Sequence, residues 1–308
     1  MANMVKVEHL SHRYNERWAI RDINFEIARE GIVGLLGSNG AGKSTTMNII
    51  CGVLRQTEGE VFINGVSLRE RPVEAKRQVG FLPQKPPLYP DFTVEEYLTY
   101  CADLRMVEKS KIKQSVATAA ERCGVTHFRE RLLKNLSGGY QQRVGIAQAI
   151  VHDPAFVVLD EPTNGLDPNQ IVEVRHLIRD IARERSVLLS THILSEVRAT
   201  CDEIKMIEQG ELVFAGTVDA FDNYIAPNTL LLTLQQPPPP ADLLAIEGVG
   251  EVKELGGPRL RLGFDGDAAT ARRVAERCVA ADWGLIEITI EKSSMDAVFA
   301  RLSRKSNN

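Results

Sequence analysis

The sequence has no long apolar run, no excess of basic residues and no paired cysteines, and each absence excludes a class of protein. Without an uninterrupted apolar run of about 18 residues, we expect no membrane-spanning helix, and the first residues lack the apolar stretch of a secretory signal. The 37 Lys and Arg against 41 Asp and Glu give a net charge of -4, which argues against nucleic acid as the main partner. The five cysteines are scattered without C-x-x-C spacing. That pattern predicts neither a disulfide framework nor a zinc site, and it is typical of a reducing cytoplasm.

What is present is the composition of a globular chain. Hydrophobic residues make up 44% and charged residues 25% of the 308 residues, a length that suits about two domains. The residue composition changes after Pro227, where a proline-rich stretch follows a short apolar run. We therefore predict a first domain over residues 1–222 and a small accessory domain over residues 223–308.

The first domain has the element order of an α/β protein. Alternating residues at 5–10 and 23–27 predict an antiparallel β-region, and the apolar run 32–36 leads through a glycine-rich loop into a helix at 43–54. A mostly helical insert follows at 91–123, opened by a capping box that begins at Thr93. The α/β pattern then resumes with a buried apolar strand.

The second domain is predicted to be α+β. Short strands and amphipathic helices alternate in the order β-α-β-β-α-β, which is typical of a ferredoxin-like fold. The four prolines at 237–240 are interpreted as a stiff connection inside this domain.

The strongest chemical signal is a phosphate-binding loop. Residues 37–44, Gly-Ser-Asn-Gly-Ala-Gly-Lys-Ser, match the pattern G-x-x-x-x-G-K-[ST] between a strand and a helix. Glycines allow backbone N–H groups to point at phosphate oxygens, and the start of the helix adds its positive end. Lys43 would neutralise the β- and γ-phosphates, and the Ser44 hydroxyl would bind Mg²⁺. The alternative is an ordinary glycine turn with an accidental Lys-Ser, which the strand–loop–helix context argues against.

An acidic strand end completes this kind of site. The apolar run 156–159 ends in Asp160 and Glu161. Such a strand would bring Asp160 beside the water shell of Mg²⁺, and Glu161 would polarise the attacking water as a general base. On its own, the pattern could equally be a strand end in which Asp160 caps the following turn.

A second anion-binding helix start occurs at residues 136–139, Leu-Ser-Gly-Gly. Its serine and glycines leave backbone N–H groups and a hydroxyl free for an anion. One nucleotide is not easily bound by two distant helix ends of one domain, so this end is predicted to bind the γ-phosphate held by another copy. The alternative is a plain helix N-cap by Ser137.

Taken in order, these motifs resemble those of the nucleotide-binding subunits of ABC transporters over about residues 4–222. The resemblance implies a P-loop ATPase fold of that type, with an N-terminal antiparallel β-region and a helical subdomain at about residues 85–150. It implies ATP as the substrate and Mg²⁺ as the cofactor. The fifth position of the signature departs from the family, because Tyr140 stands where glutamine is usual.

The resemblance also assigns roles to single residues. Gln84 corresponds to the glutamine that senses Mg²⁺ and water, His192 to the switch histidine at the γ-phosphate, and residues 164–167 to the D-loop. Tyr14 corresponds to the aromatic residue that stacks on adenine, with Trp18 as a rival. The implied site residues are: catalytic, Glu161, His192 and Gln84; nucleotide-binding, Tyr14, Gly37, Ser38, Asn39, Gly40, Ala41, Gly42, Lys43, Ser44 and Thr45; signature, Leu136, Ser137, Gly138 and Gly139; D-loop, Asp167; and Mg²⁺, Ser44, Gln84 and Asp160, the last through water.

As partners, the resemblance implies a second ATPase subunit in a head-to-tail homodimer and one or more transmembrane permease subunits. The chain is then expected in the cytoplasm, on the inner face of the cell membrane through its permease, with the insert 91–123 as docking surface. The tail 293–302 is similar to that of ABC-2-type exporters, so export is the expected direction. Two alternatives stay open: a soluble ABC-class ATPase not coupled to transport, and a module that holds nucleotide without turnover.

Overall fold

The computed structural model describes residues 3–28, 30–225, 228–291 and 295–305. By their internal contacts these residues form two units. One unit holds the chain up to Val218 and again from Leu302 onward, and the other holds Asp219–Arg301. The first division lies close to the predicted boundary at residue 222, whereas the return of the last helix to the first unit was not predicted. The predicted start of that helix at Ser294 lies outside the described residues.

An antiparallel sheet opens the first unit, as the sequence predicts. Its order is β2-β1-β4-β5, with strands β1 (Val5–Tyr14), β2 (Arg17–Ile27), β4 (Glu58–Ile63) and β5 (Val66–Ser67). The turn between β4 and β5 places Asn64 and Gly65 at φ 49° and 77°. Positive φ at both central residues is the geometry of a tight hairpin turn, which an Asn-Gly pair favours.

A second, mostly parallel sheet carries the site. Its order is β10-β9-β3-β8-β7-β6, with strands β3 (Gly31–Leu36), β6 (Val79–Leu82), β7 (Phe156–Asp160), β8 (Ser186–Ser190), β9 (Glu203–Glu208) and β10 (Glu211–Thr217). Strands β7 and β8 are buried along their whole length, as parallel strands covered on both faces should be. The carboxyl ends of β3, β7 and β8 therefore meet at one edge, where ligands bind in open α/β sheets.

Four helices accompany these strands in the described part of the first unit: α1 (Lys43–Ile50), α2 (Pro72–Arg77), α6 (Pro168–Ala182) and α7 (Leu194–Thr200). Helix α8 (Val218–Asp222) begins at the last residue of this part, and its other residues belong to the second unit. The predicted helix at 43–54 was too long. It ends at Ile50, because Gly52 takes a positive φ of 67° that stops the helical path.

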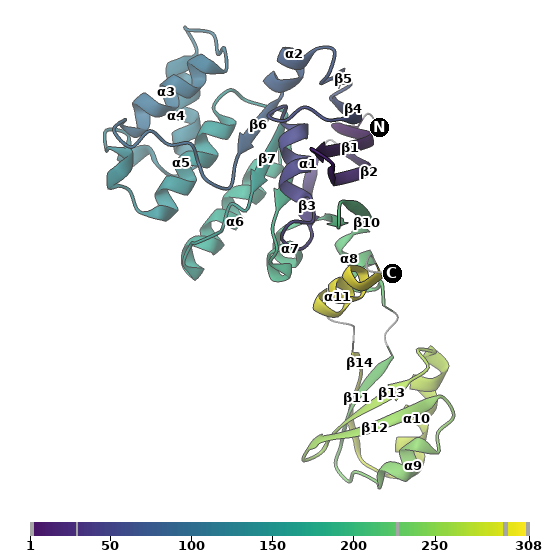
Figure 1. Ribbon diagram of the computed structural model, residues 1–308. Coiled ribbons are helices and arrows are strands. Elements are labelled where there is room, and N and C mark those ends of the chain that lie inside the picture. Colours follow the sequence, from purple (N-terminus) through teal and green to yellow (C-terminus); the bar gives the residue numbers. More distant parts are fainter. Residues whose placement is uncertain (1–2, 29, 226–227, 292–294, 306–308) are drawn as a thin grey trace. The chain divides into compact units, whose positions relative to one another are not determined.

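The helical insert consists of α3 (Val94–Leu104), α4 (Ile112–Arg122) and α5 (Gly138–Ile150), with short 3₁₀ turns at Thr126–Phe128 and Leu133–Asn135. These three helices pack on one another, and α5 also packs on β6 (Figure 1). The predicted capping box is confirmed. The Thr93 hydroxyl accepts from the Glu96 N–H at 3.2 Å, and the Glu96 carboxylate accepts from the Thr93 N–H at 2.8 Å.

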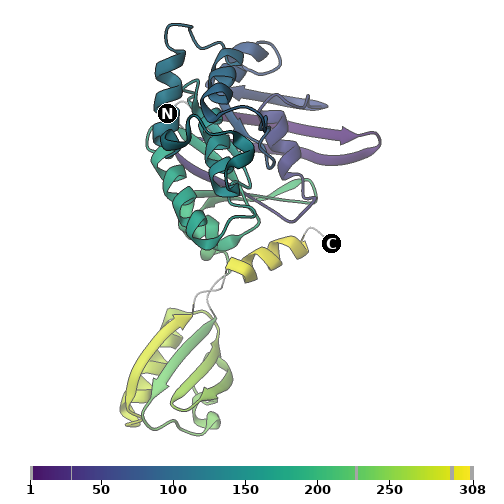
Figure 2. The ribbon, with the colours of Figure 1, turned by 90° about the vertical axis from the view of Figure 1, so that its left-hand side faces the viewer.

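The second unit has the predicted ferredoxin-like order. Its elements are β11 (Thr229–Leu234), α9 (Pro240–Leu244), β12 (Val249–Gly256), β13 (Arg259–Phe264), α10 (Ala268–Ala280) and β14 (Leu285–Glu291). The sheet is antiparallel in the order β12-β13-β11-β14, with α9 and α10 on one face (Figure 2). Leu230, Leu262 and Cys278 belong to its buried core. The predicted order includes α9, but no residues were assigned to it: the run 237–240 was interpreted as a stiff connection, and α9 begins at its last proline. The chain continues into α11 (Met295–Lys305).

All five cysteines are buried free thiols. No helix in the described part of the chain combines the length and the apolar character needed to cross a bilayer.

The capping box makes a prediction about stability. Thr93→Ala removes the hydroxyl that accepts from the N–H of Glu96, so we expect the free energy of unfolding to fall by about 1 kcal/mol. Urea titration followed by circular dichroism measures this change. Thr99→Ala, an exposed position inside the same helix, is the control and should be neutral or slightly stabilising. An equal loss in both variants would contradict a capping role.

Candidate nucleotide-binding and catalytic site

The phosphate loop lies between β3 and α1 and leaves no room for side chains at two of its glycines. A Cβ at Gly37 would lie 2.1 Å from the Ile207 carbonyl oxygen of β9, and one at Gly42 would lie 2.5 Å from the Ile20 side chain of β2. Gly42 also takes a φ of 110°, which other residues rarely adopt. The loop is thus packed between two strands, and its shape depends on glycine.

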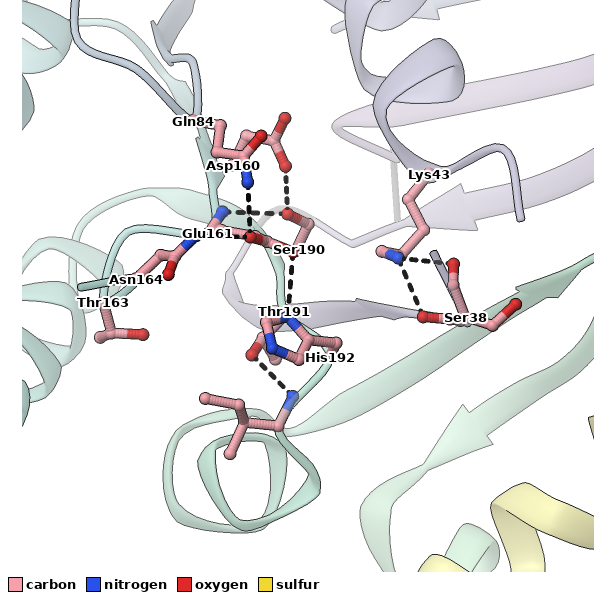
Figure 3. Close-up of polar contacts among 12 residues, drawn as sticks. Ser38, Lys43, Gln84, Asp160, Glu161, Thr163, Asn164, Ser190, Thr191 and His192 are labelled. Carbon is pink, nitrogen blue, oxygen red and sulfur yellow. Dashed lines mark hydrogen bonds and ion pairs between the residues drawn. The ribbon is translucent and has the colours of Figure 1, made fainter. Parts of the chain in front are cut away.

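Lys43 is the cation of this loop. Its side chain is buried, and Nζ donates to the carbonyl oxygens of Gly37 and Ser38 at 2.9 and 3.0 Å (Figure 3). Burial lowers the pKa of Lys43, while the nearby carboxylates oppose that shift. Helix α1 begins at the same place with no side chain capping its first N–H groups. A buried ammonium held only by carbonyls, beside an uncapped helix start, fits a phosphate group.

Glu208, at the end of β9, contacts the phosphate loop at Ser38. Its carboxylate accepts from the N–H of Ser38 at 3.2 Å and from the Ser38 hydroxyl at 2.5 Å. The Ser303 hydroxyl, from the returning part of α11, donates to the same carboxylate at 3.3 Å. Glu208 was not predicted as a site residue, because it is the last residue of an ordinary strand, β9, 170 residues away from Ser38.

The acidic strand end is tied to its neighbour by one hydroxyl. Asp160, the last residue of β7, is buried and accepts a short hydrogen bond from Ser190 Oγ at the end of β8. The backbone N–H of Glu161 donates to the same oxygen of Ser190 at 3.0 Å. Glu161 itself adopts a φ of 48°. The carboxyl group of Glu161 is therefore aimed by a left-handed turn immediately after the strand.

Three segments bring polar side chains to the Glu161 carboxylate. Oε2 accepts from Gln84 Nε2 at 2.8 Å and from Asn164 Nδ2 at 3.1 Å. Oε1 lies 3.0 Å from His192 Nδ1 (Figure 3). The sequence indicated Gln84, Glu161 and His192 separately, and the structure brings them together. The contact of Asn164 with Glu161 was not predicted, although Asn164 stands in the predicted D-loop.

The other predicted residues lie on neighbouring elements. Asp167 caps α6, since its Oδ1 accepts from the N–H groups of Asn169 and Gln170 at 3.0 and 2.9 Å. Ser137 stands at the start of α5, yet its side chain makes no capping hydrogen bond. Ser137 thus occupies the N-cap position that the alternative assigns to it, but its hydroxyl makes no capping hydrogen bond there. A Cβ at Gly138 would meet nothing within 4 Å, so this helix start is open.

Two aromatic residues of the sequence analysis now have defined surroundings. Tyr14 is 52% exposed at the end of β1, in a strand pair whose other strand packs on the phosphate loop. Tyr14 packs edge-on against His12, with ring centres 4.7 Å apart. Its rival Trp18 lies under the guanidinium groups of Arg13 and Arg21, 5.7 and 5.5 Å from the ring centre.

Tyr140, the unusual residue of the signature, packs edge-on against Phe128 with ring centres 4.5 Å apart. Arg143 lies over the same ring at 5.9 Å. Tyr140 therefore anchors the start of α5 to the 3₁₀ turn Thr126–Phe128.

The parallel sheet, the glycine loop and the acidic strand end define a P-loop nucleotide hydrolase. A family model described as "ABC transporter" matches residues 20–164. The linearmycin resistance ATP-binding protein LnrL of Bacillus subtilis (strain 168) is 27% identical over 97% of this chain and 98% of its own. The bacitracin transport ATP-binding protein BcrA of Bacillus licheniformis is 34% identical over 69% of each chain.

The fold is similar to solved cassettes as well. The dimeric structure of the ATP-binding cassette MJ0796 bound to ADP and Pi gives a TM-score of 0.63 at 25% identity, over 70% of this chain and 99% of that one. The chain therefore belongs to the ATP-binding subunits of ABC transporters, and it is an ATPase.

Lys43→Ala tests the phosphate loop. Loss of a charge-assisted contact to phosphate should weaken ATP binding about 10- to 100-fold, because such contacts contribute about 1.5–3 kcal/mol. Equilibrium titration with a fluorescent ATP analogue measures the affinity. Lys6→Ala, at an exposed position of β1, is the control and should bind ATP like the wild type. Unchanged affinity in Lys43→Ala would refute the assignment of this loop.

Proposed function

We propose that this ATPase is the energising subunit of an exporter, working as a head-to-tail pair around two ATP molecules and driving a separate transmembrane permease. The observation that carries the proposal is the convergence of Gln84 and His192 on the carboxylate of Glu161, at the strand edge that also bears the phosphate loop. That cluster has the composition needed to activate a water molecule next to a bound phosphate.

Within one site, we assign the phosphates to residues 37–45 and the adenine ring to Tyr14. Mg²⁺ would be held by Ser44 and Gln84 and, through water, by Asp160; when bound, it neutralises charge on the phosphate oxygens. Glu161 takes the proton of the attacking water. His192 contacts the γ-phosphate and so links the base to the nucleotide.

The pairing of two copies is supported by the signature segment 136–139. The Ser137 hydroxyl is not used in capping, and Gly138 stands open at the start of α5. An uncapped helix start attracts an anion. The D-loop residue Asp167 follows the catalytic turn and would lie between the two sites. The dimeric form of the related cassette MJ0796 agrees with such a pair.

Docking to a permease is assigned to the helical insert. A groove of about 930 Å³ runs between α3 and α4, lined in part by Phe92, Tyr100 and Val116. Tyr89 and Tyr100 are 49% and 38% exposed and pack edge-on at 5.6 Å. Charged residues of both signs border the same groove: Asp91, Glu95, Glu96 and Asp103, together with Lys109 and Lys113. A short segment with apolar and charged side chains, from the cytoplasmic side of a permease, matches this lining.

The proposed direction of transport, export, and the proposed location at the cytoplasmic face of the membrane are supported by the names of the relatives. LnrL is described as a resistance protein and BcrA as a transport protein, and both names fit removal of a toxic compound. The composition suits a reducing compartment. The permease would bring the chain to the membrane.

Glu161→Gln tests both the base and the partner. The variant should bind ATP like the wild type while steady turnover falls at least about 100-fold, because the proton acceptor is lost. It should also accumulate as an ATP-bound dimer, measured by size-exclusion chromatography with light scattering. Wild-type turnover would show that Glu161 is not the base.

The same tagged variant, incubated with ATP and gently solubilised native membranes, should retain a polytopic membrane protein in fixed proportion, identified by mass spectrometry. A dimer that binds ATP but retains no membrane protein would favour a soluble ABC-class ATPase instead.

Tyr100→Glu tests the docking groove. A carboxylate placed among aromatic and acidic residues should reduce recovery of the membrane partner at least about 10-fold, because charge in an apolar contact is costly. Val279→Glu changes a 70% exposed apolar residue of α10 in the same way and is the control. Equal recovery with both variants would move the docking surface elsewhere.

A further inference from the structure

The amide of Asn164 lies against the general base and has no role in the function proposed so far. Nδ2 of Asn164 donates to Glu161 Oε2 at 3.1 Å. The backbone N–H of Asn164 donates to the Glu161 carbonyl oxygen at 3.1 Å, which closes a four-residue turn. Donor and acceptor thus belong to one turn, and the amide reaches the carboxylate without help from another element.

This turn is fixed to the end of β8 by a buried carboxylate. Thr163 Oγ1 donates to Glu196 Oε1 at 2.6 Å, and Thr191 Oγ1 donates to Glu196 Oε2 at 2.7 Å. Glu196 is only 2% exposed. Arg175 lies 3.6 Å from the same carboxylate. Because these contacts are buried, the position of Asn164 is set by the fold rather than by the nucleotide.

The other two hydrogen-bond partners of Glu161, Gln84 and His192, also contact the nucleotide complex in the proposed function. Gln84 Nε2 also binds Oε2, at 2.8 Å, and in the proposed function this side chain turns to Mg²⁺. His192 binds Oε1 at 3.0 Å, and in the proposed function its ring turns to the γ-phosphate. When both are engaged by the nucleotide, Oε1 is left for water, and Oε2 keeps the contact with Asn164.

We propose that Asn164 is a positioning residue for the general base, which holds Oε2 of Glu161 in place while Gln84 and His192 contact the nucleotide complex. The inference rests on the proposed catalytic role of Glu161. In the step that it supports, the water oxygen bonds to the γ-phosphorus as the bond to ADP breaks, and the water proton passes to Glu161. Asn164 contributes orientation only, which affects the transition state and not the binding of ATP.

Asn164→Ala therefore lowers kcat about 10-fold and leaves the KM for ATP, the affinity for ATP and the melting temperature close to wild type. Steady-state ATP hydrolysis by the full chain measures kcat and KM. Asn169→Ala removes another exposed asparagine, in the first turn of α6, and is the matched control with wild-type kinetics expected.

A second experiment separates positioning from a general effect on structure. In a Glu161→Gln background, single-turnover hydrolysis of radiolabelled ATP should be the same with and without Asn164→Ala, because the carboxylate that Asn164 holds is gone. An equal fold-loss in both backgrounds, or wild-type kcat in Asn164→Ala alone, overturns the inference. Wild-type turnover in Glu161→Gln would instead refute the proposed base, so the two failures are distinguishable.

Discussion

The hydroxyl of Ser190 joins the ends of two parallel strands, and the order of the site depends on that joint. It donates to Asp160 and accepts from the backbone N–H of Glu161. One small side chain on β8 thereby fixes both acidic residues at the end of β7, Asp160 within the strand and Glu161 directly after it. After Ser190, Thr191 is linked to the turn that carries Glu161 through Glu196, which also accepts from Thr163, and His192 contacts Glu161 directly. Neighbouring parallel strands end at the same edge, so side chains distant in sequence arrive together.

Charge balance is the second constraint on this edge. Lys43 is buried among the charges of Asp160, Glu161 and Glu208, all of which favour its protonated form, while burial opposes it. One cation among three carboxylates leaves the edge acidic, and a polyphosphate adds further negative charge. The N–H groups at the start of α1 offset part of it. This balance supports the divalent cation assigned to the site.

The sequence was sufficient where the information is local. The phosphate loop and the capping box at Thr93 each depend on a few adjacent residues, and those predictions about structure are confirmed. The C-terminal element order likewise led to the correct sheet arrangement. Helix ends were less accurate, because α1 stops at a backbone conformation that periodicity does not encode.

Contacts between side chains that are distant in the sequence, or that depend on the path of a turn, could not be predicted from the sequence. The bond from Ser38 to Glu208 joins two segments that no motif relates. The contact of Asn164 with Glu161 depends on the exact path of a four-residue turn. Gln84 and His192 were indicated only through the family resemblance, and their meeting at one carboxylate is a property of the assembled sheet.

The backbone of Glu161 has a consequence for how this chain can be made more robust. A left-handed φ of 48° at a residue with a side chain, directly before Pro162, is strained by about 1–3 kcal/mol. Glycine would relieve that strain, but it would remove the carboxylate. Selection for heat resistance alone would thus favour glycine at this position, which could not act as the proposed general base. The proposed catalytic role of Glu161 therefore comes at the expense of stability.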